Sequence, residues 1–284
     1  MSDVRSNHHR TASTSTGHGS DPTGRRRSTW RAVAIPSEHG GWGLTAEPIL
    51  LGLIIGFSWP GVAVGTAALL AFLVRTPLKL YLVDRRRGRT LERTRLAARV
   101  AGIELGLIVA LTLAAISSSG SAWLIPIAAA TPFVATELWF DVRSRGRRLV
   151  PEVSGSIGIA SVAAAIVVAG GGSVAVAVGA WLILGARATT SIPFVRTQIM
   201  RLRHGTAPLV LTDVLQAVGV VVAGVAVAVE PTMIVGAAAV AAVAIVQFCW
   251  LRREFVPPAK VLGTVQMVLG LIVVAATAIG VGAL

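Results

Sequence analysis

The chain has 284 residues, of which 54% are hydrophobic and only 14% are charged, so its composition is not that of an ordinary soluble domain. The formal net charge of +13 would suit a nucleic-acid-binding protein, but no basic soluble domain remains once the long apolar runs are removed. The single cysteine, Cys249, excludes a disulfide framework or a thiolate metal site within the chain. The composition therefore predicts an all-α, polytopic transmembrane bundle whose main partner is the lipid bilayer.

The first 31 residues differ in character from the rest of the chain. Residues 1–28 are rich in Ser, Thr, Gly, His and Arg and contain almost no large apolar side chains. This composition predicts a disordered, basic cytoplasmic tail over residues 1–31. We do not expect this tail to be a signal peptide, because the first apolar run begins near Leu44 and contains Glu47 and Pro48.

The remainder, residues 32–284, predicts one transmembrane domain of about nine helices. The apolar segments cover roughly residues 42–58, 62–83, 97–117, 121–140, 153–170, 173–189, 208–229, 232–250 and 260–282. Connections without Lys or Arg alternate with connections that are rich in Arg.

The 26 basic residues decide the expected orientation. They are distributed as 6 in residues 1–31, 9 in 75–99, 4 in 143–148, 4 in 187–203 and 3 in 252–260. With nine helices and a cytoplasmic N-terminus, all of these stretches fall on the cytoplasmic side and the C-terminus lies outside.

Several charged residues are expected in or near the inner half of the membrane. They are Glu47, Glu104, Glu137, Asp141, Glu152, Asp213, Arg75 and Lys79. A charge at the centre of a membrane helix costs on the order of 2.5–3.5 kcal/mol, so these groups require pairing, hydration or a cavity. One interpretation is a belt of side chains that pair between helices, and the other is a polar cavity open to the cytoplasm.

The start of the first segment carries candidate catalytic residues. Glu38 and His39 lie at the expected membrane surface beside Gly40 and Gly41. A histidine there can act as a general acid or base or as a metal ligand, and the alternative is an interfacial histidine that caps backbone groups. The string Pro-Ser-Glu-His-Gly-Gly-Trp at residues 36–42 closely resembles the opening motif of the YwiC-like family of bacterial membrane proteins.

Further strings of this chain look like the same family. They are Arg-Thr-Pro-Leu-Lys at residues 75–79, Asp-Arg-Arg-Arg-Gly-Arg at 84–89 and Arg-Thr-Arg at 93–95, and the resemblance covers about residues 33–282. It implies a multi-pass protein of the bacterial inner (plasma) membrane and no particular activity.

A looser resemblance in architecture links the chain to UbiA-like intramembrane prenyltransferases. These enzymes have nine helices and two Asp-rich motifs that hold magnesium against an isoprenoid diphosphate. The resemblance implies Asp84 as a magnesium ligand at the end of the second segment, and a complete site would have to recruit Asp141, Glu152 or Glu47. The neighbours of Asp84 are arginines, so Arg and Lys are the alternative means of neutralising a phosphate.

The expected substrate-binding residues are cations. They are Arg75, Lys79, Arg89, Arg147 and Arg196. Arg75 and Lys79 lie four residues apart on one helix face, and their counter-charge is either a carboxylate such as Glu137 or an anionic headgroup.

Three function classes fit these features. The first is a transferase or other enzyme that acts on a phosphorylated isoprenoid or lipid from the cytoplasmic leaflet. The second is a transporter, and the third is a noncatalytic assembly or lipid-binding protein. The outer half of the bundle discriminates between the first two, because a transporter needs a polar route through that half.

Overall fold

The structure, a computed structural model, describes residues 39–89, 91–143 and 148–282. Within these ranges every regular element is a helix, which confirms the all-α fold class. The predicted tail over residues 1–31 lies outside the described residues, as do Glu38 and Arg147.

The helices follow one another with short connections. In chain order they are α2 (His39–Ile55), α3 (Trp59–Arg86), α4 (Glu92–Ser119), α5 (Leu124–Ala129), α6 (Thr131–Val142), α7 (Leu149–Ala169), α8 (Val174–His204), α9 (Val210–Val229), the 3-10 turn η1 (Pro231–Met233), α10 (Ile234–Leu251) and α11 (Ala259–Val281).

Seven of the described helices are long and apolar enough to cross a membrane. They are α3, α4, α7, α8, α9, α10 together with η1, and α11. The apolar part of α2, Trp42–Ile55, is shorter. The membrane character of the chain is thus borne out, whereas the number of nine crossings and the orientation of the termini stay predictions.

The fourth predicted segment, residues 121–140, is two helices and not one. α5 and α6 meet at Ala130, and Pro132 lies in the first turn of α6. Proline has no N–H, so the carbonyl of Ala128 cannot receive the hydrogen bond that would continue α5. The proline divides a stretch whose hydropathy alone predicts a single crossing.

The sixth predicted segment is longer than its hydropathy suggests. α8 continues through residues 188–195, which are uncharged, and reaches His204. Arg187 therefore lies inside the helix, about 26 Å before its end at a rise of 1.5 Å per residue. This corrects the assignment of Arg187 to a cytoplasmic loop.

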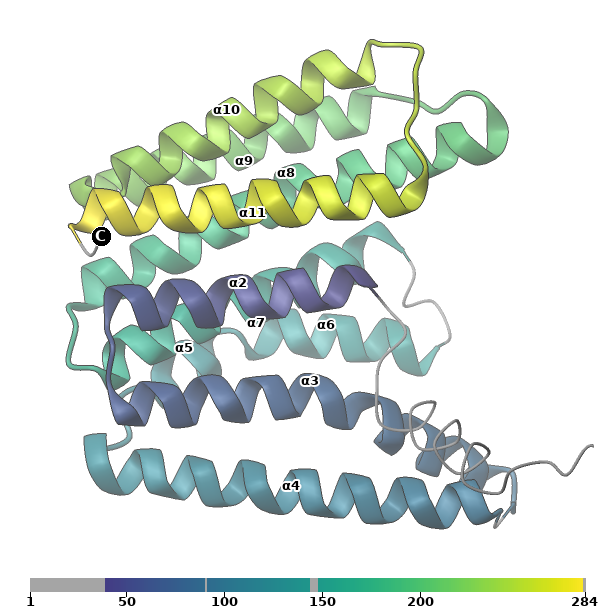
Figure 1. Cartoon of the computed structure of the whole chain (residues 1–284), viewed down its shortest axis with the longest axis vertical. Helices are drawn as coiled ribbons and strands as arrows, with labels where there is room; N and C mark the ends of the chain where they lie inside the picture. Colours follow the sequence, from purple (N-terminus) through teal and green to yellow (C-terminus); the bar gives the residue numbers. More distant parts are fainter. Residues whose placement is uncertain (1–38, 90, 144–147, 283–284) are drawn as a thin grey trace, which may run out of the picture.

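Successive helices run in alternating directions, so their ends gather at two opposite ends of the bundle (Figure 1). At one end α3, α8 and α10 finish and α4, α9 and α11 begin. This end carries Arg85, Arg93, Arg201 and Arg252, and we call it the basic end. We call the other end of the bundle the opposite end, and the helices that end there are α2, α4, α7, α9 and α11.

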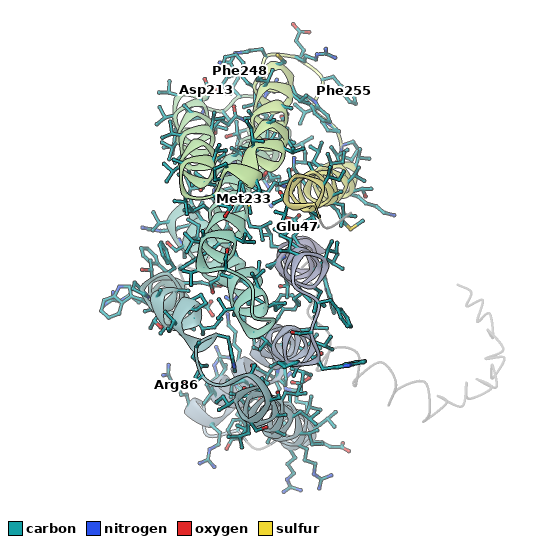
Figure 2. All side chains as sticks on the ribbon, turned by 90° about the vertical axis from the view of Figure 1, so that its left-hand side faces the viewer. Glu47, Arg86, Asp213, Met233, Phe248 and Phe255 are labelled. Carbon is teal, nitrogen blue, oxygen red and sulfur yellow. The ribbon has the colours of Figure 1, made fainter. Side chains whose placement is uncertain are left out.

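The cross-section of the bundle is elongated, as the view along the helices shows (Figure 2). α7 and α8 are the most buried helices and lie in the middle, whereas α4 forms one edge and packs chiefly against α3. Large apolar side chains are exposed on the perimeter, including Ile103 on α4, Val221 on α9 and Ile245 on α10. A perimeter of this kind suits contact with lipid.

The orientation can be measured with cysteines introduced at the two ends. In a Cys249→Ser background, we expect Cys at Ser119 or Ser173 to react with a membrane-impermeant maleimide added to intact cells. Cys at Gly205 should react only after permeabilisation, because the Arg-rich end stays in the cytoplasm. Labelling of the Gly205 position in intact cells would contradict the predicted topology.

Candidate functional site

Two helices near the basic end are joined by a cluster of ion pairs. The Arg75 guanidinium on α3 lies 2.6 Å from Glu137 and 3.6 Å from Asp141, both on α6. The Lys79 ammonium lies 3.0 Å from Asp141. The structure thus supplies carboxylates as counter-charges for Arg75 and Lys79, the first of the two alternatives that the sequence leaves open.

Glu137 is held against the next helix by a glycine. A Cβ at Gly155 of α7 would overlap the Glu137 carboxylate, so a larger residue at this position would require that side chain to shift. α6 is therefore tied to α3 by charge and to α7 by close packing, despite being separated from α5 by the break at Ala130.

Two further carboxylates at the basic end are also paired with cations. Asp84 lies 3.3 Å from Arg93 and accepts a 2.7 Å hydrogen bond from Thr94, whereas Glu152 lies 3.0 Å from Arg196. Arg89, at the end of the α3–α4 turn, is exposed, and its backbone N–H bonds the Asp84 carbonyl.

A further pair joins α9 to the segment after α10. The Arg252 guanidinium lies 2.8 Å from the Asp213 carboxylate, and this hydrogen bond raises the pKa of Arg252 above its ordinary value. Interhelical pairing is thus a general feature of this end.

The predicted magnesium ligands are held in separate interactions. Asp84, Asp141 and Glu152 each pair with a different cation. Within the described ranges, no group of three or more His, Cys, Asp or Glu side chains is placed to hold a metal ion. The magnesium site stays a prediction, and any phosphate at this end would meet arginine and lysine first.

Among the ion pairs of the described residues, the one with both side chains buried lies in the middle of the bundle. Glu47 on α2 and Arg187 on α8 approach to 3.6 Å, with side chains only 6% and 3% exposed. A Cβ at Gly270 of α11 would lie 1.7 Å from the Glu47 Oε1, so glycine at this position makes room for the carboxylate. The pair joins three helices that are remote in sequence.

Arg187 is further held by polar groups of two helices. Its Nη2 donates to the Gln266 carbonyl at 2.6 Å, and its Nη1 donates to the Gln266 Oε1 at 3.3 Å and to the Ser191 hydroxyl. Gln266 also accepts from Gln247 on α10 at 3.3 Å. A guanidinium has five donors, so this set satisfies most of its hydrogen-bonding capacity away from water.

A column of polar side chains leads from this pair to the basic end. Along one side of α8 the buried residues after Arg187 include Ser191, Thr197 and Gln198, and the column ends at Arg201. Facing them are Thr212, which hydrogen-bonds Thr197 at 2.7 Å, and Gln216, both on α9, together with Gln247 of α10 and Gln266 of α11.

Much of this column is incompletely hydrogen-bonded. The buried atoms without a partner include Arg187 Nε, Gln198 Nε2, both amide atoms of Gln216, Gln247 Oε1 and Gln266 Nε2. Buried polar atoms that lack a protein partner characteristically face water or a ligand. The column is therefore the described part of the interior best suited to hold polar molecules.

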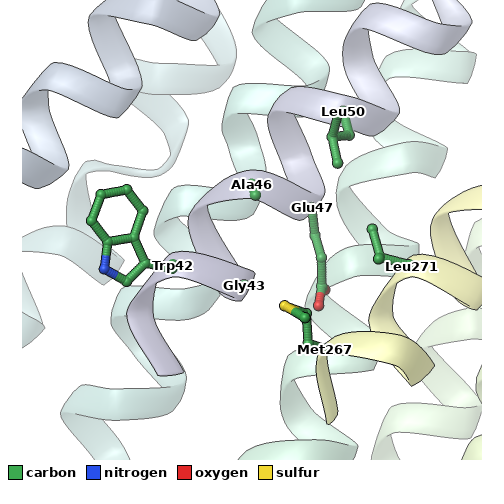
Figure 3. Close-up of a pocket in the computed structure, with 7 residues that line it drawn as sticks. All are labelled: Trp42, Gly43, Ala46, Glu47, Leu50, Met267 and Leu271. Carbon is green, nitrogen blue, oxygen red and sulfur yellow. The ribbon is translucent and has the colours of Figure 1, made fainter. Parts of the chain in front are cut away.

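A cavity of about 290 Å³ lies between α2 and α11, beside the buried ion pair. Its lining residues are Trp42, Gly43, Ala46, Glu47 and Leu50 from α2 and Met267 and Leu271 from α11 (Figure 3). Glu47 is the one charged side chain of this lining, and its carboxylate points toward Met267.

The sequence-predicted residues and the central site overlap only at Glu47. His39 is the first residue of α2, whereas Arg75, Lys79 and Arg196 belong to ion pairs nearer the basic end. Arg187 was missed as a site residue because Arg-rich stretches read as loops. The uncharged run at residues 188–195 could have indicated that the helix continues past Arg187. Glutamines within apolar segments are a second signal, because buried polar groups are unusual in a membrane helix.

Residues 35–168 match the YwiC-like protein family. The match is shorter than the expected resemblance over residues 33–282 and reaches from the start of α2 to the end of α7. It contains Glu47, whereas Arg187 lies beyond it. No curated protein and no solved structure matches the chain.

Removing one member of the buried pair should be more damaging than removing both. Glu47→Gln leaves Arg187 without its counter-charge, and we expect a loss of about 3–5 kcal/mol in the free energy of unfolding. The double variant Glu47→Gln/Arg187→Gln carries no unpaired charge and should recover at least half of that loss. Thermal unfolding of the detergent-solubilised proteins measures both.

The matched control is Glu230→Gln at the opposite end, where the carboxylate bonds the Thr232 hydroxyl and no buried cation depends on it. This variant should unfold like the wild type. A double variant that is no more stable than the Glu47→Gln single variant would show that the ion pair does not hold the bundle.

Proposed function

Residues 35–168 of this membrane protein are YwiC-like, and on that premise we propose that the chain binds a lipid-derived substrate within the leaflet at its basic end. The single observation that carries the proposal is the uneven distribution of buried polar groups along the bundle. The Glu47–Arg187 pair lies in the middle of the bundle, and the column leading from it extends to the basic end.

The opposite part of the described interior is largely apolar. Ser161 on α7 and Thr277 on α11 are buried there, and each hydroxyl donates to a carbonyl of its own helix. The indole N–H of Trp123, just before α5, is buried there without a partner. A transporter needs a polar route through both halves of the bundle. The confinement of most buried polar groups to one part therefore favours a site that is approached from one leaflet, and it disfavours a pathway across the membrane.

The substrate class that we propose is a phosphorylated isoprenoid or lipid. Arg75 and Lys79 are 45% and 60% exposed, so a phosphate at the basic end can share them with Glu137 and Asp141. Charge-assisted bonds from arginine and lysine are the usual means of holding a phosphate. The hydrocarbon part would then lie along the apolar flank of the bundle.

The proposed reaction is transfer of the isoprenoid or lipid group from its phosphate or diphosphate to an acceptor molecule, with release of that phosphate or diphosphate, as in UbiA-like intramembrane transferases. Glu38 and His39, which precede and begin α2, are the proposed acid–base residues, and Arg89, Arg147 and Arg196 are further proposed phosphate contacts. A lipid-binding protein without catalysis is the alternative, and the two differ in whether a bound phosphorylated isoprenoid is consumed.

The phosphate contact can be tested by ligand-induced thermal stabilisation. We expect farnesyl diphosphate to stabilise the wild-type protein, and Arg75→Gln/Lys79→Gln to lose most of that stabilisation because the two cations are gone. Without ligand the double variant should lose about 1 kcal/mol or less, since half-exposed ion pairs contribute little.

The control is Arg252→Gln, which removes a comparable cation at the same end but on the far side of the bundle. It should retain the stabilisation by farnesyl diphosphate. A wild-type protein that neither farnesyl diphosphate nor phosphatidic acid stabilises would refute the proposed substrate class.

A further inference from the structure

The turn between α3 and α4 gathers arginines at the basic end. Residues 84–99 contain seven arginines and only two carboxylates, Asp84 and Glu92, and Asp84 is already bound by Arg93 and Thr94. The arginines that are exposed and form no ion pair with another described residue include Arg85, Arg86, Arg87, Arg95 and Arg99. We call these five side chains the arginine tip. Its positive charge is left unneutralised by the ion pairs of the described chain.

The length of α3 places this tip beside the lipid headgroups. At the opposite end Phe57 and Trp59 are 67% and 78% exposed, as expected of aromatic side chains at a membrane interface. A hydrocarbon core of about 30 Å takes about 20 helical residues, so from Trp59 it ends near Lys79. Arg85 and Arg86 lie about 9–11 Å beyond that level. A headgroup layer of about 5–8 Å separates them from the core, and their long side chains reach back into it.

α4 leads to the same depth by a separate count. It ends at Ser119, and about 20 residues of helix lead back from there to Arg99 at the edge of the hydrocarbon. Arg95 lies about 6 Å further out. The tip therefore extends through the layer in which the phosphates of the lipids lie.

Apolar side chains stand among these arginines. Leu82, Val83 and Leu91 are all exposed on the same turn. An acidic protein or a nucleic acid that approached from the water would offer them no apolar partner. The boundary between hydrocarbon and headgroups offers acyl chains to the apolar side chains and phosphates to the arginines.

The turn that carries the tip is held in a fixed shape. The Asp84 carboxylate accepts from Arg93 Nη2 at 3.3 Å and from the Thr94 hydroxyl at 2.7 Å, and the same hydroxyl oxygen accepts from the Leu91 N–H at 3.2 Å. Gly88 closes the turn with a φ of 64°, in the left-handed region that favours glycine. Because the backbone is already ordered, less conformational entropy is lost when the arginines bind a ligand.

We propose that the arginine tip binds the headgroups of anionic phospholipids in the leaflet at the basic end. The ligand class is a phosphodiester with a net negative charge and two acyl chains, such as phosphatidylglycerol. A zwitterionic lipid carries its own cation and gains less from the arginines. This inference does not rest on the proposed transfer reaction, and it uses none of the residues proposed above as phosphate contacts.

The test compares two lipids that differ only in the headgroup. Binding of dioleoyl phosphatidylglycerol and of dioleoyl phosphatidylcholine to the detergent-solubilised protein is measured by native mass spectrometry. We expect phosphatidylglycerol to bind the wild type at least about tenfold more tightly. Each cation beside an anionic membrane surface strengthens attachment about fivefold, so Arg86→Gln/Arg87→Gln/Arg95→Gln should lose most of this preference. Equal affinities of the two lipids for the wild type would overturn the proposal.

The matched control removes three exposed cations from the same end of other helices. It is Arg203→Gln/Arg253→Gln/Lys260→Gln, at the ends of α8 and α10 and the start of α11. The control should keep the preference for phosphatidylglycerol, because Arg86 lies at the other edge of the elongated cross-section from α10 and α11 (Figure 2). An equal loss in both triple variants would mean that net charge alone attracts the lipid, and the tip would not be a site.

Soluble anions provide a further arm of the test. Neither inorganic phosphate nor polyglutamate should stabilise the protein against thermal unfolding as phosphatidylglycerol does. Stabilisation of equal size by either anion, lost in the tip variant, would identify a soluble occupant and overturn the proposal.

The tip variant also separates this inference from the phosphate contact at Arg75 and Lys79. It should keep the stabilisation by farnesyl diphosphate, and loss of both responses would merge the two sites and overturn the inference. If farnesyl diphosphate fails to stabilise the wild type while the preference for phosphatidylglycerol depends on the tip, the phosphate contact is wrong and the tip assignment stands.

Discussion

The ion pair between Glu47 and Arg187 is the interaction on which the centre of the bundle depends. Each charge would be costly alone among apolar helices, so α2 and α8 must keep their separation and rotation to hold the two groups together. Gly270 extends this constraint to α11, because any larger residue would collide with the carboxylate. Three helices from distant parts of the sequence are thereby held in one arrangement.

The position of this pair divides the interior into two unlike parts. Toward the basic end, α8 presents Ser191, Thr197 and Gln198 to polar residues of its neighbours, whereas toward the opposite end the buried surface is almost wholly apolar. A polar interior that stops part way suits chemistry or binding in one leaflet. The lateral cavity lies where α2 and α11 meet beside the pair, and its lining surface is almost wholly apolar.

The charges at the basic end have a different physical role from the central pair. Arg75 and Lys79 are about half exposed and each pairs with a carboxylate of α6, so they can exchange partners at little cost. The two sets of charges are thus complementary, one rigid and buried, the other accessible. A carboxylate cluster of the UbiA-like kind does not form among the described residues, because each of Asp84, Asp141 and Glu152 is occupied by its own cation.

The sequence by itself determined the fold class, the membrane character and the resemblance to YwiC-like proteins, because apolar runs and a local motif are readable without knowing which helices touch. It also singled out Glu47, since a carboxylate in an apolar run is unusual wherever it lies. Tertiary structure alone decided that Arg187 is its partner and that α2 and α11 enclose a cavity. These features depend on the rotation and spacing of helices that lie more than 100 residues apart, which hydropathy and charge patterns do not encode.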